Sequence, residues 1–493
     1  MKPSTFLAFD IGASSGRGVL GELKNDGLQI REICRFPNGM IPVRGHLRWN
    51  IFNLLSHVKE GLRFCAQDSD NRPASVGIDT WGVDFGLLAD DGSILGLPFG
   101  YRDSRTDGAM ESFFRKIPRE RVYELTGIQF LQFNSLFQLE AMVRDKSPLL
   151  DVATDVLFIP DLLNYLLAGI KKTEFTFATT SQLYNPIKKD WEEELLSALD
   201  VRKSLMQEIV KTGSVIGETT SDVSKEIGLD PIPVVAVATH DTGSAVAAVP
   251  ASGRGWAYIS SGTWSLMGIE IQKPIINEQS LQLNFTNEGG VGDTFRFLKN
   301  IAGLWLLEEC RRVWSKKRNR DYEDLLALAE DAAPFTALID PDWSGFLNPP
   351  HMPEAIRRFC RDTRQVSPDS HGTVVRCILE SLALKYRLVL EQLRQLSPEP
   401  INRIHIIGGG VQNRLLCQYT ADATGLPVVA GPVEATAIGN IMVQALSAGC
   451  VASLAEMREV IGRSFRLLEY EPQNAKEWDL AYNKFKEINQ RFK

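Results

Sequence analysis

The amino-acid sequence predicts an α/β protein made of two related domains, and three observations support this prediction. Residues 234–238 are uncharged and rich in β-branched side chains, as in a central parallel strand covered on both faces. A strand, a Ser/Gly turn and a second strand occur over 5–20 and again over 255–268. A chain of 493 residues is also too long for one hydrophobic core. Together these features predict a duplicated α/β domain with a ligand site in the cleft between the halves.

The charge balance and the cysteines limit the function classes. The chain has 54 Lys and Arg against 61 Asp and Glu, a net charge of −7, which argues against sequence-independent binding of nucleic acid. No uncharged run is long enough to cross a membrane. The seven cysteines are scattered and lack a C-x-x-C pair, which favours reduced structural thiols. We therefore expect a cytoplasmic protein with neither a nucleic-acid nor a membrane partner.

The first strand, over residues 5–9, ends at Asp10 and leads through a Gly/Ser turn into a second strand over 19–23. Backbone amides at such a turn can hold phosphate oxygens, because Gly12 and Gly16 permit close approach and positive φ. Asp10, at the strand end, would lie near a phosphate-bound Mg²⁺ ion. The alternative interpretation is a plain hairpin turn.

A third strand is predicted over 28–36, a helix over about 50–65, and two strands over 74–78 and 83–89. The turn between the last two strands brings Asp79, Trp81 and Asp84 together. Carboxylates accept hydrogen bonds from sugar hydroxyls and an indole covers the apolar face of a sugar, so the group suits a polyol. Trp81 could equally be a core residue. The mostly helical stretch over about 105–205 is predicted to be an insertion that shapes a pocket.

Asp241 follows the buried strand at 234–238 without a linker and opens a helix. A carboxylate at this place lies where open α/β sheets bind ligands. The alternative role is a helix N-cap. The neighbouring His240 and Thr242, together with the glycine turns, favour a functional role.

In the second half, the turn at 260–263 would supply a second set of hydrogen-bond donors. A long helix over about 371–397 precedes a buried strand at 403–407 and a triple-glycine turn at 408–410, a further anion or nucleotide locus. Gly439 lies inside a helix, where two backbones can approach closely. The basic run at 315–320 is predicted to be a solvated face. The last helix, at 474–492, is expected to pack back on the body of the protein.

Several motif classes are absent from the sequence. There is no G-x-x-x-x-G-K-[ST] loop and no strand-borne G-x-G-x-x-G, which excludes the P-loop and Rossmann classes. H-E-x-x-H and G-x-S-x-G are also missing, so zinc proteases and nucleophile-elbow hydrolases have no support.

Several pieces of the sequence share a resemblance that spans essentially its whole length. They are Asp10-Ile-Gly-Ala-Ser-Ser-Gly-Arg17, Gly77-Ile-Asp-Thr-Trp-Gly-Val-Asp-Phe85, Tyr101-Arg-Asp-Ser-Arg-Thr106, His240-Asp-Thr242, Ser260-Ser-Gly-Thr-Trp-Ser-Leu-Met-Gly268, Lys299-Asn300 and Gly408-Gly-Gly410. The set resembles the FGGY carbohydrate kinases of the actin-like ATPase superfamily, and within them the kinases of L-rhamnulose. This resemblance implies two ribonuclease-H-like domains with the active site in the interdomain cleft.

The resemblance also implies roles for individual residues. Asp241 corresponds to the general base of the family. The implied nucleotide contacts are Ala13, Ser14, Ser15, Gly16, Arg17, Thr263, Glu308 and Gly409. The implied sugar contacts are Gly82, His240, Asp241, Thr242 and Asn300. Phosphoryl transfer needs positioning and charge stabilisation more than covalent chemistry, so one base, backbone amides and Mg²⁺ would suffice.

The resemblance therefore predicts ATP-dependent phosphorylation of the 1-hydroxyl of L-rhamnulose. We expect a sugar-binding domain over 1–245, a nucleotide-binding domain over 246–493 whose last helix returns to the first, and a monomer or weak homo-oligomer. A kinase for another ketose, such as L-fuculose or L-xylulose, stays open. An actin-like ATPase acting as a chaperone or filament subunit and a catalytically silent sugar sensor are further alternatives.

Overall fold

The structure, a computed structural model, describes residues 4–24, 27–68, 71–315, 321–347 and 349–490. The chain divides into two compact units, the first containing residues up to Ser252 with Glu270–Phe297 and Ala435–Ser464, the second containing Gly253–Ile269, Leu298–Glu434 and the residues from Phe465 on. The sequence-based division at 245/246 makes each domain one continuous segment, whereas two later segments belong with the first unit. Most of the basic run at 315–320 lies outside the described residues.

The first unit contains a six-stranded sheet in the order β13-β14-β6-β1-β2-β3. Its strands are β1 (Ser4–Ile11), β2 (Ser15–Lys24), β3 (Gly27–Pro37), β6 (Val76–Thr80), β13 (Ser214–Glu218) and β14 (Pro233–Ala236). Strands β1, β6 and β14 are parallel neighbours, while β1, β2 and β3 form an antiparallel meander. The predicted hairpin and central parallel strand are both present, although β14 ends two residues earlier than expected.

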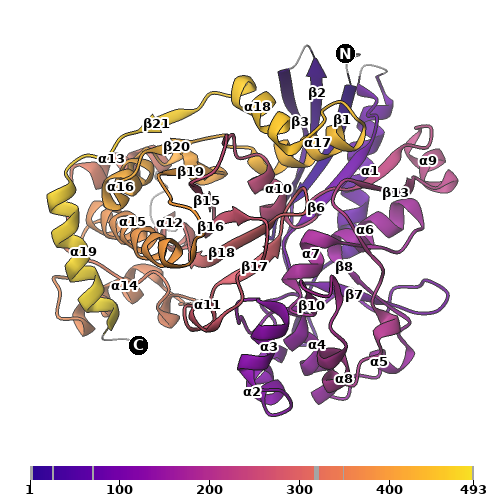
Figure 1. Cartoon of the computed structure of the whole chain (residues 1–493), viewed down its shortest axis with the longest axis horizontal. Coiled ribbons are helices and arrows are strands. Elements are labelled where there is room, and N and C mark those ends of the chain that lie inside the picture. The colour runs from indigo at the N-terminus through magenta and orange to yellow at the C-terminus, as the bar shows by residue number, and fades with distance from the viewer. Residues whose placement is uncertain (1–3, 25–26, 69–70, 316–320, 348, 491–493) are drawn as a thin grey trace. The chain divides into compact units, whose positions relative to one another are not determined.

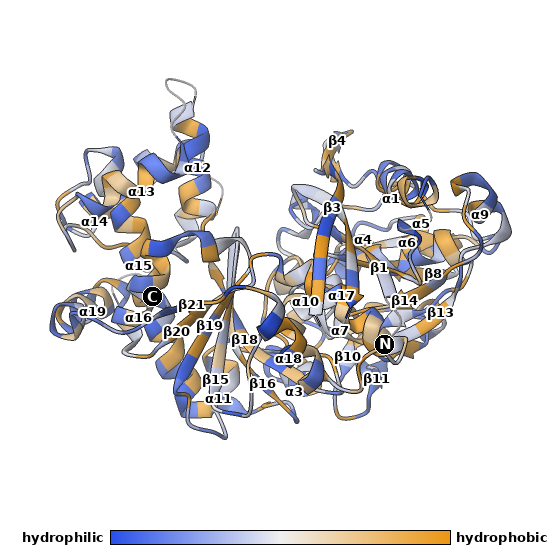
Figure 2. Ribbon diagram, turned by 90° about the horizontal axis from the view of Figure 1, so that it is seen from above, coloured by the Kyte–Doolittle hydropathy of each residue, from blue (hydrophilic) through white to orange (hydrophobic). Residues whose placement is uncertain are grey.

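Helices cover both faces of this sheet because successive residues of a strand point to opposite sides. On one face, α1 (Ile51–Ala66) and α6 (Ile159–Ala168) pack in a core that includes Ile78 of β6. Asn50 caps α1 by accepting a hydrogen bond from the amide of Asn53, as expected for the helix predicted over about 50–65. The edge strand β3 shows alternating hydrophobic and hydrophilic bands in Figure 2.

The opposite face is covered by α10 (Asp241–Ala247) and by a helix from much later in the chain, α17 (Ala435–Ser447). Figure 1 shows α17 and α18 (Leu454–Ser464), in yellow, beside the indigo strands β1, β2 and β3. The amide of Gln444 on α17 donates to the carbonyl of Leu7 on β1 at 3.0 Å. This return of the chain brings side chains from the C-terminal third under the ends of β1 and β6.

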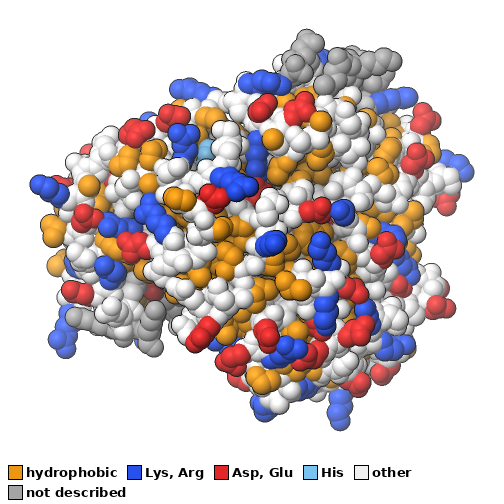
Figure 3. All heavy atoms as spheres, in the orientation of Figure 1, with side chains coloured by type: hydrophobic (Ala, Val, Ile, Leu, Met, Phe, Trp, Pro, Cys, Tyr) orange, Lys and Arg blue, Asp and Glu red, His pale blue; other side chains and the backbone are white. Residues whose placement is uncertain are grey.

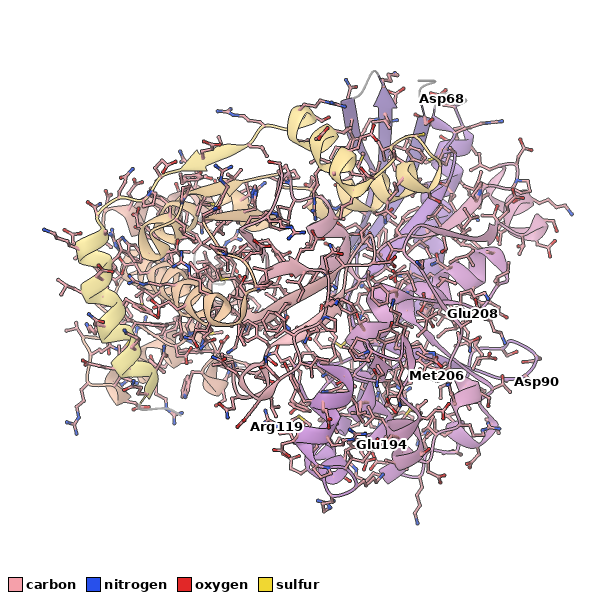
Figure 4. All side chains as sticks on the ribbon, viewed as in Figure 1. Asp68, Asp90, Arg119, Glu194, Met206 and Glu208 are labelled. Carbon is pink, nitrogen blue, oxygen red and sulfur yellow. The ribbon has the colours of Figure 1, made fainter. Side chains whose placement is uncertain are left out.

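The predicted insertion over about 105–205 is a helical region with its own core, and it also contains short strands. Arg121 of α3 forms an ion pair with Glu194 of α8 at 2.7 Å. Figure 4 labels Arg119, Glu194 and Met206 in this part of the first unit. Besides α6, the α-helices of this region are α2 (Ala109–Phe114), α3 (Arg119–Thr126), α4 (Ser135–Arg144), α5 (Leu149–Val152), α7 (Phe175–Thr180) and α8 (Glu193–Leu199), and the strands are β8 (Asp155–Phe158), β9 (Thr173–Glu174), β10 (Tyr184–Asn185) and β11 (Asp190–Trp191).

The remaining elements of the first unit are short. They are β4 (Ile41–Val43), β5 (His46–Arg48), β7 (Phe85–Leu88), β12 (Ile209–Val210), α9 (Ser221–Ile227), α11 (Glu278–Gln282) and β17 (Thr286–Gly289). Strand β7 pairs with β8, and β12 pairs with β9.

The second unit is built on β15 (Trp256–Ser261), β16 (Trp264–Ile271), β18 (Phe295–Ala302), β19 (Arg403–Ile407), β20 (Val428–Ala430) and β21 (Leu468–Tyr470). Strands β15 and β16 form an antiparallel hairpin, and β15 runs parallel to β19. The first unit has the same arrangement in β1, β2 and β6, so the repeat that the sequence predicts is present in the structure.

The helices of the second unit are α12 (Trp305–Ser315), α13 (Tyr322–Glu330), α14 (Met352–Asp362), α15 (His371–Leu396), α16 (Arg414–Thr424) and α19 (Ala475–Gln490). The last helix, which is expected to return to the N-terminal domain, belongs to the second unit. Helix α19 packs on α15 and α16, where the phenol of Tyr482 donates to Glu391 at 2.6 Å. Its apolar stripe, with Trp478 and Phe485, is buried within the second unit.

No helix of the described residues is long and apolar enough to cross a membrane. Acidic and basic side chains are interspersed on the face shown in Figure 3, in keeping with the small net charge of −7.

Candidate active site

Three carboxylates lie at the carboxyl ends of neighbouring parallel strands in the first unit. Asp10 of β1 pairs in register with Asp79 of β6. The amide of Thr80 donates to the carbonyl of Thr239 at 2.9 Å, which carries the pairing on to His240, just before Asp241. The sheet therefore brings Asp10, Asp79 and Asp241 to one edge, the edge where α/β sheets bind ligands.

The three charges affect one another strongly. Burial raises the pKa of Asp79 well above its usual value, and the charges of Asp10 and Asp241 add to this effect. Asn440 of α17 donates to Asp79 at 2.6 Å. Burial also raises the pKa of Asp241, the charge of Asp10 raises it further, and His240 acts in the opposite direction. A carboxylate whose pKa is raised by its surroundings is suited to accept a proton.

The hydrogen bonds of Asp241 are directed to one oxygen. The amide and the hydroxyl of Thr242 donate to Oδ1 at 2.6 and 3.1 Å. Nε2 of His240 lies 3.5 Å from the same oxygen. In the described part of the chain Oδ2 receives no comparable donor, and the side chain keeps 31% of its surface exposed. Oδ2 is thus the oxygen left to take a proton.

The predicted sugar contact Gly82 lies against His240. A Cβ atom added to Gly82 would come within 3.3 Å of Nε2 of His240. His240 and Thr242 are buried, whereas Asp241 is half-buried. The first unit therefore brings four of the five predicted sugar contacts together, and the fifth, Asn300, lies half-buried on β18 of the second unit.

The β1–β2 hairpin contains five of the predicted nucleotide contacts, two in its turn and three at the start of β2. The amide of Gly12 donates to the carbonyl of Ser15 at 2.9 Å, and Asn38 donates to the carbonyl of Gly12 at 2.8 Å. Ser14 and Ser15 are exposed. The expected positive φ is absent, since neither Gly12 nor Gly16 has one. Gly16 is required for a different reason, because a Cβ atom would lie 2.2 Å from the ring of Phe36.

Asp10 contacts Arg17 of the same hairpin, with Nη2 donating to Oδ2 at 2.7 Å. The described residues contain no group of three or more His, Cys, Asp or Glu side chains arranged to hold a metal. Mg²⁺ needs few protein ligands, since it is commonly held by one or two carboxylates together with water and phosphates. The half-buried carboxylate of Asp10, beside the raised-pKa Asp79, fits that oxygen chemistry.

The proposed sugar-binding role of Asp84 and Trp81 needs correction. Oδ2 of Asp84 accepts from the indoles of Trp49 and Trp81 at 2.6 and 2.9 Å and from the amide of Tyr101 at 3.1 Å. Oδ1 accepts from Gln138 at 2.8 Å. Asp84 is fully buried and Trp81 is 6% exposed, so both face the protein rather than a ligand. The cluster supports the wall of the site instead of contacting a sugar.

Asp84 gives a testable dependence of stability on pH. Burial raises its pKa to about 6, although the four donors favour the charged form. A carboxyl group whose pKa is higher in the folded state binds its proton more tightly in that state. The free energy of unfolding therefore falls as the pH rises from the pKa of the unfolded state towards the pKa of the folded state. Between about pH 5 and pH 7 the protein should lose about 1.4 kcal/mol of stability relative to Asp84→Asn. Urea unfolding of both proteins at each pH measures this difference, and a pH-independent difference would refute the assignment.

In the second unit, the β15–β16 turn and the triple-glycine turn meet. Thr263 lies at the tip of the β15–β16 hairpin and is exposed. The amide of Trp305 donates to the carbonyl of Thr263 at 3.1 Å, which ties this tip to the start of α12. A Cβ atom on Gly410 would lie 2.0 Å from Oγ of Ser261, so the two turns touch. Gly409 is exposed and has open space at its Cβ position. Thr263 and Gly409 thus lie at the same end of β15 and β19.

The predicted nucleotide contact Glu308 is exposed on α12. Both of its carboxylate oxygens accept from Nη1 of Arg311 at 2.9 Å. An acidic side chain beside a nucleotide would be repelled by the phosphates, but the guanidinium of Arg311 offsets its charge.

The side chains that hold the strand ends in place could not be recognised in the sequence. Glu174 is fully buried and accepts from the amide and the hydroxyl of Thr239 at 3.1 and 2.9 Å. The hydroxyl of Thr176, which also bonds Glu174, accepts from the amide of His240 at 3.3 Å. Glu174 therefore fixes the backbone that leads to Asp241. Nothing in the local pattern around 174 marks this role, because Thr239, the partner next to His240, lies 65 positions away.

Comparisons with known proteins match both halves of the chain. A family model described as the FGGY family of carbohydrate kinases, N-terminal domain, matches residues 5–248, and the model of the C-terminal domain matches 257–448. The chain is 52% identical over 481 residues to a rhamnulokinase of Bacteroides thetaiotaomicron, covering 98% of both chains. It is 42% identical over 495 residues to a rhamnulokinase of Pectobacterium atrosepticum, covering 99% of this chain and 97% of that one.

Solved structures confirm the predicted fold. A ligand-bound xylulose kinase of Lactobacillus acidophilus superposes with a TM-score of 0.83 at 15% identity, covering 99% of this chain and 98% of the other. A glycerol kinase of Plasmodium falciparum with ADP gives a TM-score of 0.81 at 16% identity, with the same coverage. At such low identity these structures establish the two-domain α/β architecture alone.

Proposed function

Since the chain belongs to the FGGY family of carbohydrate kinases, we propose that it transfers the γ-phosphoryl group of ATP to the 1-hydroxyl of L-rhamnulose. The products are L-rhamnulose 1-phosphate and ADP. The observation that carries the choice of sugar is the 52% identity to a rhamnulokinase over 98% of both chains. The chemistry rests on the exposed Oδ2 of Asp241 at the edge of the parallel strands.

In this mechanism Asp241 is the general base. Oδ2 takes the proton of the 1-hydroxyl while the hydroxyl oxygen forms its bond to the γ-phosphorus and the bond to the bridging oxygen of ADP breaks. Both donors of Thr242 bond Oδ1, which fixes the carboxylate plane and leaves Oδ2 available to accept a proton. The raised pKa of Asp241 favours acceptance of the proton at neutral pH.

The other residues bind and orient the substrates. We assign the sugar to Gly82, His240, Thr242 and Asn300. We assign the nucleotide to the turn Ala13–Arg17, to Thr263 and Gly409, whose backbone amides suit phosphate oxygens, and to Glu308. Asp10 would hold Mg²⁺ with the phosphates, and the ion would neutralise their charge.

A coupled assay of ADP release tests the proposed substrate. With Mg-ATP, kcat/KM should be highest for L-rhamnulose among a panel that also contains L-fuculose, L-xylulose, D-xylulose, D-ribulose and glycerol. Epimers differ by one hydroxyl group, and a site built to bond that hydroxyl rejects the wrong sugar by several orders of magnitude. A higher value for another ketose would change the pocket assignment and keep the Asp241 mechanism. Without sugar-stimulated ADP release, the proposed activity would fail.

We further propose that the protein works in the cytoplasm as a monomer or weak homo-oligomer. All seven cysteines are free in the structure, which suits a reducing compartment. Light scattering coupled to size-exclusion chromatography measures the oligomeric state, and a stable large assembly would contradict this proposal.

A further inference from the structure

A buried ion pair stands behind the ring of His240. Arg296 has no exposed surface, and its Nη2 lies 3.2 Å from Glu288 of β17. Nε of Arg296 donates to the carbonyl of Gly289 at 2.8 Å, which fixes the plane of the guanidinium. The same Nη2 lies 3.2 Å from Nδ1 of His240. One buried guanidinium thus contacts both Glu288 and His240.

The direction of the hydrogen bond to His240 follows from donor chemistry. A guanidinium has only donors, so Nδ1 of His240 must accept and cannot carry a proton. Oε2 of Glu288 lies 3.4 Å from Nδ1 of His240, but this carboxylate oxygen receives no hydrogen bond of good geometry from the described residues. A neutral imidazole whose Nδ1 accepts carries its proton on Nε2. This atom is the one that faces Oδ1 of Asp241 at 3.5 Å and the backbone of Gly82.

The ion pair also favours the charged form of Glu288. Although burial acts to raise it, the guanidinium of Arg296 holds the pKa of Glu288 below its usual value. The ring of Phe177 packs edge-on against His240, with centroids 6.4 Å apart, and limits its rotation. Within the described residues, the charged groups recorded against the imidazole are Arg296, Glu288 and Asp241.

We propose that Arg296, held by Glu288, fixes His240 in the tautomer with the proton on Nε2, so that His240 presents a hydrogen-bond donor to Asp241 and to the sugar. Arg296 and Glu288 are positioning residues, since they act through His240. The sugar atom that meets Nε2 must then be an acceptor, a hydroxyl or carbonyl oxygen. The part of this inference that concerns the sugar rests on the proposed function, whereas the tautomer does not.

The tautomer can be measured on the full-length protein without substrate. In two-bond ¹H–¹⁵N correlation spectra of ¹⁵N-histidine-labelled protein at about pH 8, where histidine is ordinarily neutral, the six histidines give tautomer-specific patterns. His240 is assigned by the signal missing from His240→Gln. The expected pattern has the proton on Nε2. A pattern with the proton on Nδ1, or on both nitrogens, would overturn the proposal even if the protein is a fully active L-rhamnulose kinase.

Variants test whether the pair acts on catalysis through His240. Arg296→Lys keeps the charge but cannot bond Gly289 and His240 while also pairing with Glu288. Misplacement of a group that orients the base can cost about 100-fold in rate, so we expect kcat to fall by about this factor with the KM for ATP unchanged. Arg458→Lys is the matched control, because Arg458 forms a second part-buried pair, with Glu270 at 2.8 Å, that does not contact His240. Equal effects of the two variants would contradict the positioning role.

Two further variants separate an effect on the His240 tautomer from an effect on folding. Glu288→Gln retains the donation from Arg296 to Nδ1 and should keep the Nε2–H pattern. In the double variant Arg296→Met with Glu288→Met, both charges are replaced by apolar side chains of similar size, which avoids leaving one charge buried alone. The Nε2–H pattern should be lost or mixed there. Its persistence in the double variant would show that Arg296 does not set the tautomer.

Discussion

Replacing Asp241 by Asn should lower kcat by about 10²- to 10⁴-fold, the contribution typical of a general base. The change is nearly isosteric. The amide oxygen can take the place of Oδ1 and keep the bonds from Thr242, while the amide nitrogen replaces Oδ2 and has no lone pair for a proton. Because only the proton acceptor is lost, the KM values for sugar and ATP should change little.

Steady-state ADP release gives kcat, and isothermal titration with the sugar gives the affinity of the resting protein. Asp293→Asn is a suitable control, since this side chain is 71% exposed and its partner is the surface Lys211. Its kcat should stay within about twofold of the unmodified protein, as for most surface substitutions. Turnover of Asp241→Asn within tenfold of that value would remove Asp241 from the role of base.

The sequence predicts those parts of the site that short segments encode. Apolar strands lead into Asp10, Asp79 and Asp241 in the sequence. This pattern places the three carboxylates at strand ends, and parallel strands of one sheet end at a common edge. The strand-turn-strand repeat predicts the paired hairpins, and both are present. The ligand contacts assigned to these residues stay predictions, since they depend on molecules that have to be bound.

The sequence could not predict the contacts between distant segments. Asn440 and Gln444 lie on a helix within the predicted second domain, yet their side chains bond Asp79 and the carbonyl of Leu7 in the first. Arg296 contacts His240 across 56 positions, and its apolar neighbours in β18 suggest only a buried strand. Such contacts depend on how distant segments of the chain come together, and this leaves no periodic pattern in the sequence.

A second limit is that a residue type does not reveal its partners. Asp84 and Asp241 both sit beside a strand and near a Trp or His, so the sequence suggests ligand chemistry for both. In the structure Asp84 accepts four bonds from protein donors, whereas Asp241 keeps one oxygen open. Burying a carboxylate costs free energy unless donors surround it, and the donors of Asp84 come from four separate segments.

Gly439 lies where α17 crosses α10, the helix that begins at Asp241. A Cβ atom on Gly439 would lie 1.8 Å from the carbonyl oxygen of Ser244 and 2.6 Å from its carbon. Both neighbours are backbone atoms, so no side-chain rotation can relieve the clash. The close approach expected for Gly439 from the sequence is thus confirmed, and it determines the distance between the two helices.

Gly439→Ala should therefore separate α10 from α17 and displace Asp241 relative to Asp10 and Asp79. Overpacking of this kind costs about 1–3 kcal/mol or more, which exceeds the gain of about 1 kcal/mol from alanine in a helix. A shift of about 1 Å in the base can cost about 100-fold in kcat.

Gly462→Ala is the matched control, since this glycine lies in the neighbouring helix α18 and its nearest contact is 3.7 Å away. Thermal unfolding and ADP release should show a lower midpoint and low kcat for Gly439→Ala, and an equal or higher midpoint with normal kcat for Gly462→Ala. If Gly439→Ala kept both the midpoint and kcat, the tight crossing of α10 and α17 would not be what positions the base.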